Sequence, residues 1–228
     1  MSTFLQLVND VERESGTVNT TSRTTDVTAP PTGRQEKIIA MTRQAWEMVQ
    51  NSRTDWPWMQ VETTKVLTIG QTRYNAITDF ALANFARWQR HTRYFSPFSI
   101  YDTALGRKDE GDLDFWPYSD WKIAHDRGFE ANGRPIEYSL DAQRRFCVGP
   151  PPDKAYTLRA TYYRKPQLLA VNADEPICPS EHHQVIVWQA LMLLHGHDEG
   201  NFSLQFAQSN FASAFRALVN DRDDFMED

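Results

Sequence analysis

The stretch from Val185 to Leu194 is apolar except for Gln189 and spans about ten residues. On a helix it would have no polar face, so other elements of the fold must cover it from every side. A bilayer span needs about 20 apolar residues, which this stretch does not supply. The sequence therefore predicts a soluble protein with this helix at the centre of its core.

Two capping boxes predict helices near the N-terminus, because in each a Thr stands three residues before a Gln. The boxes are Thr3 with Gln6 and Thr32 with Gln35. The first helix should run to about Glu14, with Gly16 as its stop, and the second should end near Arg53, ahead of a proline.

Between these helices, the stretch from Gly16 to Gly33 holds seven threonines, two prolines and no aromatic residue. Loops longer than about 12 to 15 residues are uncommon in compact domains unless they have a role or are disordered. Two interpretations stay open for residues 17–32: a solvated insertion, or a contact arm to a neighbouring subunit.

Two further helices close the chain. Ser180 should cap the central helix, which Gly196 ends, and Asn201 should cap the last one. Apolar residues at three- and four-residue spacing predict a narrow buried seam on this last helix. The seam consists of Leu204, Ala207, Phe211, Ala214 or Phe215, and Leu218.

Strand patterns fill the middle of the chain. Residues 60–69 are rich in β-branched side chains, and Gly70-Gln71 predicts a hairpin turn to residues 72–75. The aromatic segment 80–101 contains Pro97, which favours an edge strand. Further strands are expected at 135–140, 145–148 and 156–163, with a short helix at 117–126.

These patterns predict an α+β protein in which N- and C-terminal helices pack around an antiparallel sheet, in a single domain with long loops. The length of 228 residues is compatible with one domain of this kind. We expect helical parts at about 3–53 and 180–222, a β-rich insertion at about 58–165 and a C-terminal tail at 221–228.

The formal net charge is −6, and the segment from Asp198 to the end accounts for −5 of it, since it holds seven acids and two arginines. The preceding residues are nearly neutral, which argues against general attraction to nucleic acid. Cys147 and Cys178 show neither CxxC spacing nor a disulfide framework. The N-terminal residues lack the pattern of a secretory signal.

Three polar clusters are candidate sites, each with a plainer alternative. Four histidines near the central helix (His182, His183, His195 and His197) are spaced too far apart for a shared metal, and surface or capping roles are favoured. The acids Asp109, Glu110, Asp112 and Asp114 lack the EF-hand pattern and predict a solvated turn. Arg87, Arg90 and Arg93, with aromatic neighbours, could contact DNA or other subunits, or pack on aromatic rings.

Enzyme motifs are absent: no phosphate-binding loop, GxGxxG, GxSxG or HExxH occurs. We expect no catalytic activity, no cofactor and no metal.

An ordered set of short motifs is more specific than any of its members. It comprises TFLQLV at 3–8, Trp56-Pro57-Trp58, TIGQ at 68–71, Tyr74, IYD at 100–102, GRP at 133–135, PPPD at 150–153, YYRKP at 162–166, DEP at 174–176 and IVWQALM at 186–192. Taken together, these motifs resemble the head-to-tail adaptor, or connector, family of tailed bacteriophages across nearly the whole chain.

The resemblance implies a virion protein assembled in the host cytoplasm. It would form a ring of identical subunits, twelvefold by analogy with portals, between the portal protein and tail or neck proteins. DNA would pass through its channel without specific binding, and no membrane would be involved. The acidic tail is then a candidate portal anchor, through Asp223, Asp224, Phe225, Met226 and Glu227.

Other functions remain open at this point. The chain could be another neck or tail component, of the tail completion or terminator type. A carbohydrate-binding module would need exposed Trp and Tyr side chains, and a metal hydrolase would need the four histidines.

Overall fold

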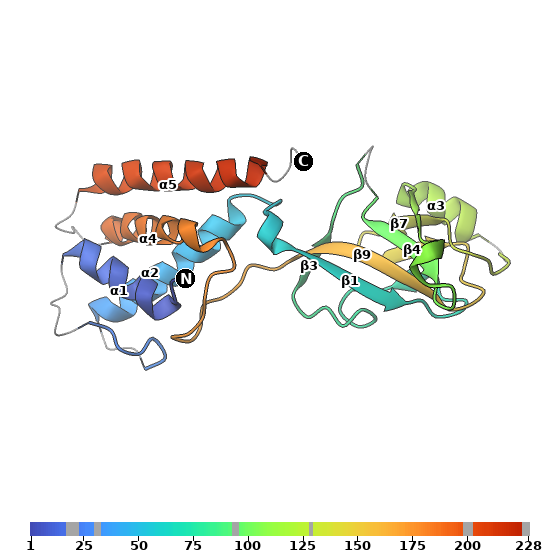
Figure 1. The fold of residues 1–228 in the computed structure, drawn as a ribbon, viewed down its shortest axis with the longest axis horizontal. Coiled ribbons are helices and arrows are strands. Elements are labelled where there is room, and N and C mark those ends of the chain that lie inside the picture. The colour runs from blue at the N-terminus through green and yellow to red at the C-terminus, as the bar shows by residue number, and fades with distance from the viewer. Residues whose placement is uncertain (17–22, 30–32, 93–95, 128–129, 198–202, 225–228) are drawn as a thin grey trace. The chain divides into compact units, whose positions relative to one another are not determined.

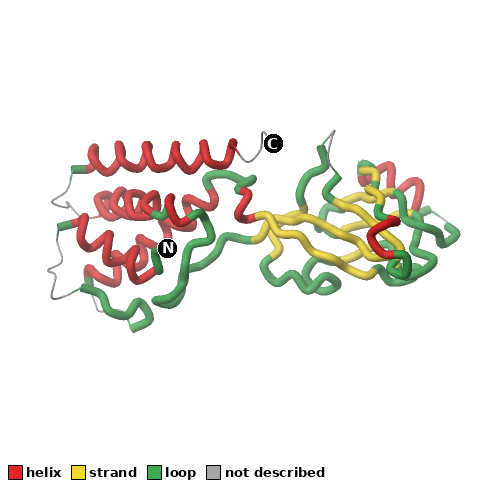
Figure 2. Tube along the Cα trace, in the orientation of Figure 1, coloured by secondary structure: helices red, strands yellow, loops and turns green. Residues whose placement is uncertain are grey.

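A computed structural model gives the fold of the chain and describes all residues except 17–22, 30–32, 93–95, 128–129, 198–202 and 225–228. The chain divides into two compact units (Figures 1 and 2). The helical unit contains residues 1–59 and 166–228, and the β unit contains residues 60–165. The predicted α+β class is confirmed.

In the helical unit, α4 is the central element, as predicted. It packs against α1, α2 and α5, and this covers its apolar side chains on several sides. Val185, Ile186 and Leu194 have no exposed surface. The elements of this unit are α1 (Phe4–Ser15), α2 (Arg34–Asn51), η2 (Pro57–Met59), η4 (Ser180–His182), α4 (Gln184–His197) and α5 (Leu204–Asp224).

The first capping box is confirmed, and the second is wrong. The Thr3 hydroxyl accepts a hydrogen bond from the Gln6 N–H, and the Gln6 side chain accepts one from the Thr3 N–H. Gly16 ends α1 with a φ of 65°, in the left-handed region that glycine adopts without strain. At α2 the N-cap is Gly33, with no side-chain cap bond, while Thr32 lies outside the described residues.

Neither predicted cap holds for the C-terminal helices. Ser180 begins the short 3₁₀ turn η4, which precedes α4. At α5 the Ser203 hydroxyl accepts the Phe206 N–H, and Asn201 lies outside the described residues. Helix α5 continues to Asp224, so residues 221–224, assigned to the tail from sequence, are helical.

The described part of the Thr-rich stretch is anchored on its own unit. The carboxylate of Glu12 in α1 accepts hydrogen bonds from both the N–H and the hydroxyl of Thr24, at 3.1 and 2.5 Å. The Asn172 side chain accepts the Val27 N–H at 2.7 Å, and both Thr24 and Val27 are buried. Residues 23–29 are therefore not a solvated insertion.

The β unit contains two sheets. In the first, the strands follow the order β1-β9-β4-β5, and β3 also pairs with β9; in the second, the order is β2-β8-β7-β6. Among the strands that the structure describes, all pairs are antiparallel except β6 with β7. The strands are β1 (Gln60–Val66), β2 (Arg73–Tyr74), β3 (Phe85–Trp88), β4 (Phe98–Asp102), β5 (Gly111–Asp112), β6 (Asp114–Phe115), β7 (Glu137–Leu140), β8 (Phe146–Gly149) and β9 (Tyr156–Arg164); η3 (Gly106–Asp109) and α3 (Tyr118–His125) complete the unit.

Two predicted strand arrangements are wrong. The segments on either side of Gly70-Gln71 do not form a hairpin, because β1 pairs with β9 and β2 pairs with β8 in the other sheet. The strand after Pro97 is not an edge strand, since β4 lies between β9 and β5. Pro97 precedes β4 and keeps a role in the sheet, because its carbonyl accepts the Thr161 N–H at 3.1 Å.

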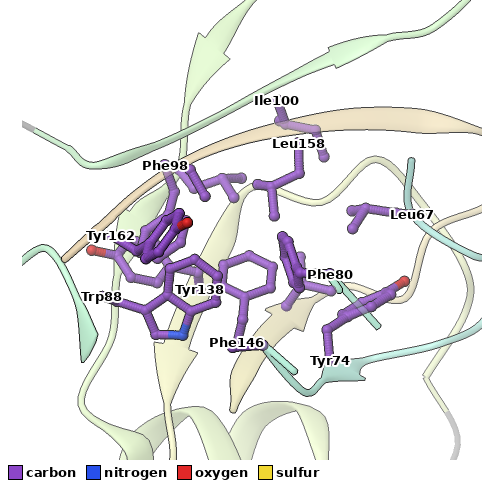
Figure 3. Packing of buried hydrophobic residues seen from close by; sticks show 14 of the residues in the cluster. Leu67, Tyr74, Phe80, Trp88, Phe98, Ile100, Tyr138, Phe146, Leu158 and Tyr162 are labelled. Atoms are coloured by element: carbon purple, nitrogen blue, oxygen red, sulfur yellow. The ribbon is translucent and has the colours of Figure 1, made fainter. Parts of the chain in front are cut away.

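Aromatic side chains from both sheets form the core of the β unit (Figure 3). The ring of Phe98 in β4 lies 4.5 Å from that of Tyr138 in β7 and 4.8 Å from that of Phe146 in β8. Trp88 in β3 joins the same cluster, 5.4 Å from Phe98. Aromatic residues far apart in the sequence, from Tyr74 to Tyr162, therefore meet in one core.

Candidate interaction surfaces

Helix α5 buries one face and leaves the other to solvent. Ala207 and Leu218 of the predicted seam are buried, and Leu204, Phe211 and Phe215 are partly buried, which confirms the seam. The ring centres of Phe215 and Trp56 lie 6.2 Å apart, and the two ring planes are nearly perpendicular. The opposite face carries mostly small or polar residues, among them Gln205, Gln208, Ser209, Ser213 and Asn220.

The portal-binding site expected from the sequence at residues 223–227 lies only partly within the residues that the structure describes. Asp223 and Asp224 belong to the last turn of α5, whereas Phe225, Met226 and Glu227 lie outside the described residues. At the start of this segment, the Asp221 carboxylate lies 3.4 Å from His182 Nε2. The end of α5 therefore packs against η4, although His182 Nε2 makes no hydrogen bond there.

The arginine cluster does not form a row on one helix face. Arg87 lies in β3, and its guanidinium stacks 4.0 Å from the centre of the Tyr163 ring. Arg90 is exposed in the segment after β3, and Arg93 lies outside the described residues. For Arg87 the alternative of packing on an aromatic ring is confirmed.

The four histidines have separate environments. His183 is buried, where its Nδ1 accepts the Ser2 N–H and its Nε2–H donates to the Cys178 carbonyl, both at 3.2 Å. Burial lowers the pKa of His183, which keeps the ring neutral. His195 is half-buried, and the His197 side chain is not described. Among the described residues, no group of three or more His, Cys, Asp or Glu side chains could hold a metal ion.

The acidic stretch 109–114 forms ion pairs, so its first two members are not solvated as predicted. Asp109 accepts hydrogen bonds from Arg134 at 2.7 Å and from the Asp102 N–H at 3.0 Å. Glu110 accepts the Ser99 hydroxyl at 2.6 Å and is paired with Arg159 at 2.9 Å. The Ser99 hydrogen bond, with those from Arg159 and Arg107, outweighs burial and lowers the pKa of Glu110 to about 2.

No sequence pattern indicated His125, a constrained titratable group at the end of α3. Its Nδ1 lies 2.8 Å from one Glu130 carboxylate oxygen, and its Nε2 lies 2.8 Å from a Glu137 oxygen. The ring also lies against Gly149 of β8, where a Cβ would meet three ring atoms at 2.6 Å. No local pattern marks this site, because its members come from α3, a loop, β7 and β8.

Two carboxylates that face both ring nitrogens favour the protonated imidazolium of His125, because in that form both nitrogens donate. Burial lowers the pKa of His125, but the hydrogen bonds and charges of Glu137 and Glu130 outweigh it, and the pKa is raised overall. Beside it, Arg73 pairs with Asp126 at 2.9 Å. These contacts hold α3 on the face of the second sheet that points away from the aromatic core.

Charge is divided unequally between the two units. The helical unit has 8 Lys and Arg against 17 Asp and Glu, a net charge of −9, and the β unit has 16 against 13, a net charge of +3. The net charge of −6 for the whole chain is therefore the sum of an acidic helical unit and a mildly basic β unit.

Other classes of site find little support among the described residues. None of the seven tryptophans is exposed, so they offer no platform for a sugar ring. Burial raises the pKa of Cys147 to about 11 and that of Cys178 to about 12, which makes both thiols poor nucleophiles. No helix in the described part of the chain is long and apolar enough to cross a membrane.

Comparison with known families gives one match that covers nearly the whole chain. The family model described as SU10 adaptor protein matches residues 2–227. A search of curated proteins finds no significant match.

Proposed function

The chain belongs to the SU10 adaptor family of phage head-to-tail adaptors, and from this premise we propose that it forms a ring of identical subunits under the portal. The ring would connect the phage head to the tail and continue the DNA channel. The observation that carries this proposal is the family match, which spans both units rather than one of them. The protein would be assembled in the host cytoplasm and would have a structural role without catalytic activity.

The portal would be contacted through the C-terminal segment. Helix α5 is packed on α4 through its seam, so Asp223 and Asp224 in its last turn belong to an anchored helix. We assign Phe225 and Met226 to an apolar pocket on the portal, with Asp223, Asp224 and Glu227 facing basic residues at its rim. The acidic charge of the helical unit supports a basic partner.

DNA would pass without specific binding. Phosphate binding relies on Lys and Arg that are free to replace counterions. Of the three candidate arginines, Arg87 is packed on Tyr163, and the chain as a whole carries a charge of −6. We expect no detectable binding to duplex DNA at physiological salt, and a contribution of Arg90 and Arg93 to contacts between subunits.

The test is reconstitution with the portal of the same phage. The full chain mixed with portal rings should give closed rings by electron microscopy, with the twelvefold symmetry that the family resemblance implies. A chain that ends after Arg222 keeps Asp221 and its contact with His182, so its helical unit should unfold at nearly the same temperature. It should fail to join the portal.

A matched control separates charge from the apolar anchor. Asp223→Asn with Asp224→Asn should weaken attachment in a salt-dependent way, whereas Phe225→Ala should weaken it at all salt concentrations. Normal attachment of the truncated chain would disprove the tail as portal anchor. Absence of any ring on the portal would disprove the proposed function itself.

A further inference from the structure

The long edge strand of the first sheet is open. β1 pairs with β9 along all seven of its residues, from Gln60 opposite Tyr163 to Val66 opposite Thr157, without a bulge. Its other edge receives no hydrogen bond from the described residues. Edge strands are usually protected by proline, bulges or short length, because free N–H and C=O groups recruit other strands. β1 has no proline and no bulge and runs for seven residues, so the protection it carries against other strands is the charge of Glu62 and Lys65.

The register shows which backbone groups are free. The Leu67 N–H donates to the Tyr156 carbonyl at 2.8 Å, so residue 67 belongs to a hydrogen-bonded pair with β9. Such pairs alternate along an antiparallel ladder. Residues 65, 63 and 61 therefore also face β9, and the N–H and C=O groups of Glu62, Thr64 and Val66 point away from it.

Those three residues also share one side-chain face. Glu62, Thr64 and Val66 are all exposed, and they lie on the side of the sheet opposite the aromatic core. A strand added to β1 would place every second side chain on this same outer face, directly beside Glu62.

The outer face next to β1 is hollowed and acidic. A depression of about 440 Å³ extends across β1, β9, β4 and β5, and its charged lining residues are Glu62, Glu110, Asp112 and Arg159. Arg159 lies 3.0 Å from Glu62 and 2.9 Å from Glu110. Arg107 also pairs with Glu110, at 3.1 Å, so two cations face three carboxylates. One negative charge remains in excess, which favours a basic side chain from the added strand.

A second copy of this chain is a poor source for that strand. Among the described strands, β2, β5 and β6 have only two residues each, and the outward Ala86 carbonyl of β3 is bonded to the Arg144 side chain. The remaining choice, β1 against β1, closes two copies on each other and brings together two edges that carry the same acidic depression. Such a closed pair leaves no edge for a third copy.

We propose that β1 is a docking edge for an extended segment of a different protein, which adds a strand to the sheet and places a Lys or Arg over the acidic depression. Main-chain hydrogen bonds to Glu62, Thr64 and Val66 would supply the affinity, and the charge beside Glu62 would select the sequence. The inference concerns the free chain and does not require the ring proposed above.

Peptide titration of the full chain, followed by amide NMR, tests the proposal. The probe is a nine-residue peptide of alternating threonine and valine with a central arginine, compared with the same peptide carrying a central glutamate. The arginine peptide should shift the amides of Glu62, Thr64 and Val66, and should bind about two- to fivefold more tightly than the glutamate peptide at low salt. Glu62→Gln should reduce that preference.

A pair of variants at one position isolates the edge. Thr64→Pro removes one outward N–H without removing a bond to β9, and should lower the affinity at least tenfold, whereas Thr64→Val keeps the N–H and should bind as the unaltered chain does. Thermal unfolding checks that both variants fold. The proposal would be overturned if Thr64→Pro bound the peptide as tightly as the unaltered chain, or if amide shifts were confined to other residues. It would also be overturned if the two peptides bound equally well, or if the chain dimerised through β1 without peptide.

Discussion

Replacing His125 by glutamine should destabilise the β unit in a pH-dependent way. In the structure the imidazolium donates to two carboxylates, with Glu130 and Glu137 oxygens at 2.8 Å. A hydrogen bond to a charged group contributes about 1.5 to 3 kcal/mol. A neutral glutamine cannot donate in both directions with the same geometry, so we expect a loss of about 2 to 3 kcal/mol in the free energy of unfolding at pH 5.5.

The direction of the pH dependence follows from the raised pKa of His125. The folded state binds the proton more tightly than the unfolded state, whose histidine has a pKa near 6.5. The stabilisation is therefore complete below about pH 6.5 and is lost as the pH rises through the folded pKa. The difference between the unaltered chain and His125→Gln should shrink accordingly.

Urea unfolding from pH 5.5 to 9 measures the difference in unfolding free energy between the unaltered chain and the variant. NMR titration of the His125 ring measures its pKa in the folded state. His91→Gln is the matched control, because His91 is exposed in the same unit. It should change the unfolding free energy by less than about 0.5 kcal/mol at every pH. A ring pKa at or below 6.5, or a constant difference between the unaltered chain and His125→Gln across this range, would refute the imidazolium clamp.

Three further predictions concern packing and burial. Gly149→Ala should destabilise the β unit, because the added Cβ would lie 2.6 Å from atoms of the His125 ring, and thermal unfolding would show a lower midpoint. Burial lowers the pKa of His183, so as the pH falls the unfolded state binds the proton before the folded state does. The free energy of unfolding of the helical unit should therefore decrease below about pH 6.5. His183→Gln should remove this pH dependence in urea titrations. Leu218→Ala should cost about 2 to 5 kcal/mol, since this side chain of the α5 seam is fully buried, and unchanged unfolding would mean that α5 is not anchored there.

Interactions between near neighbours in the chain could be predicted from the sequence. The capping box at Thr3, the stop at Gly16 and the seam of α5 depend on residues within one or two helical turns. The apolar run from Val185 likewise required a helix covered on all sides, and α4 is that helix. The resemblance through ordered short motifs gave the family, which the match over residues 2–227 confirms.

Partners far apart in the chain were decided only by the tertiary structure. Turn residues at Gly70-Gln71 predicted a hairpin, but β1 pairs instead with β9, about a hundred residues later, because burial of both sheets' aromatic faces outweighs local turn preference. For the same reason, nothing in the sequence around His125 indicated its two carboxylate partners. Nor could the sequence show that no described strand pairs with the outer edge of β1, since this depends on where every other strand of the unit lies.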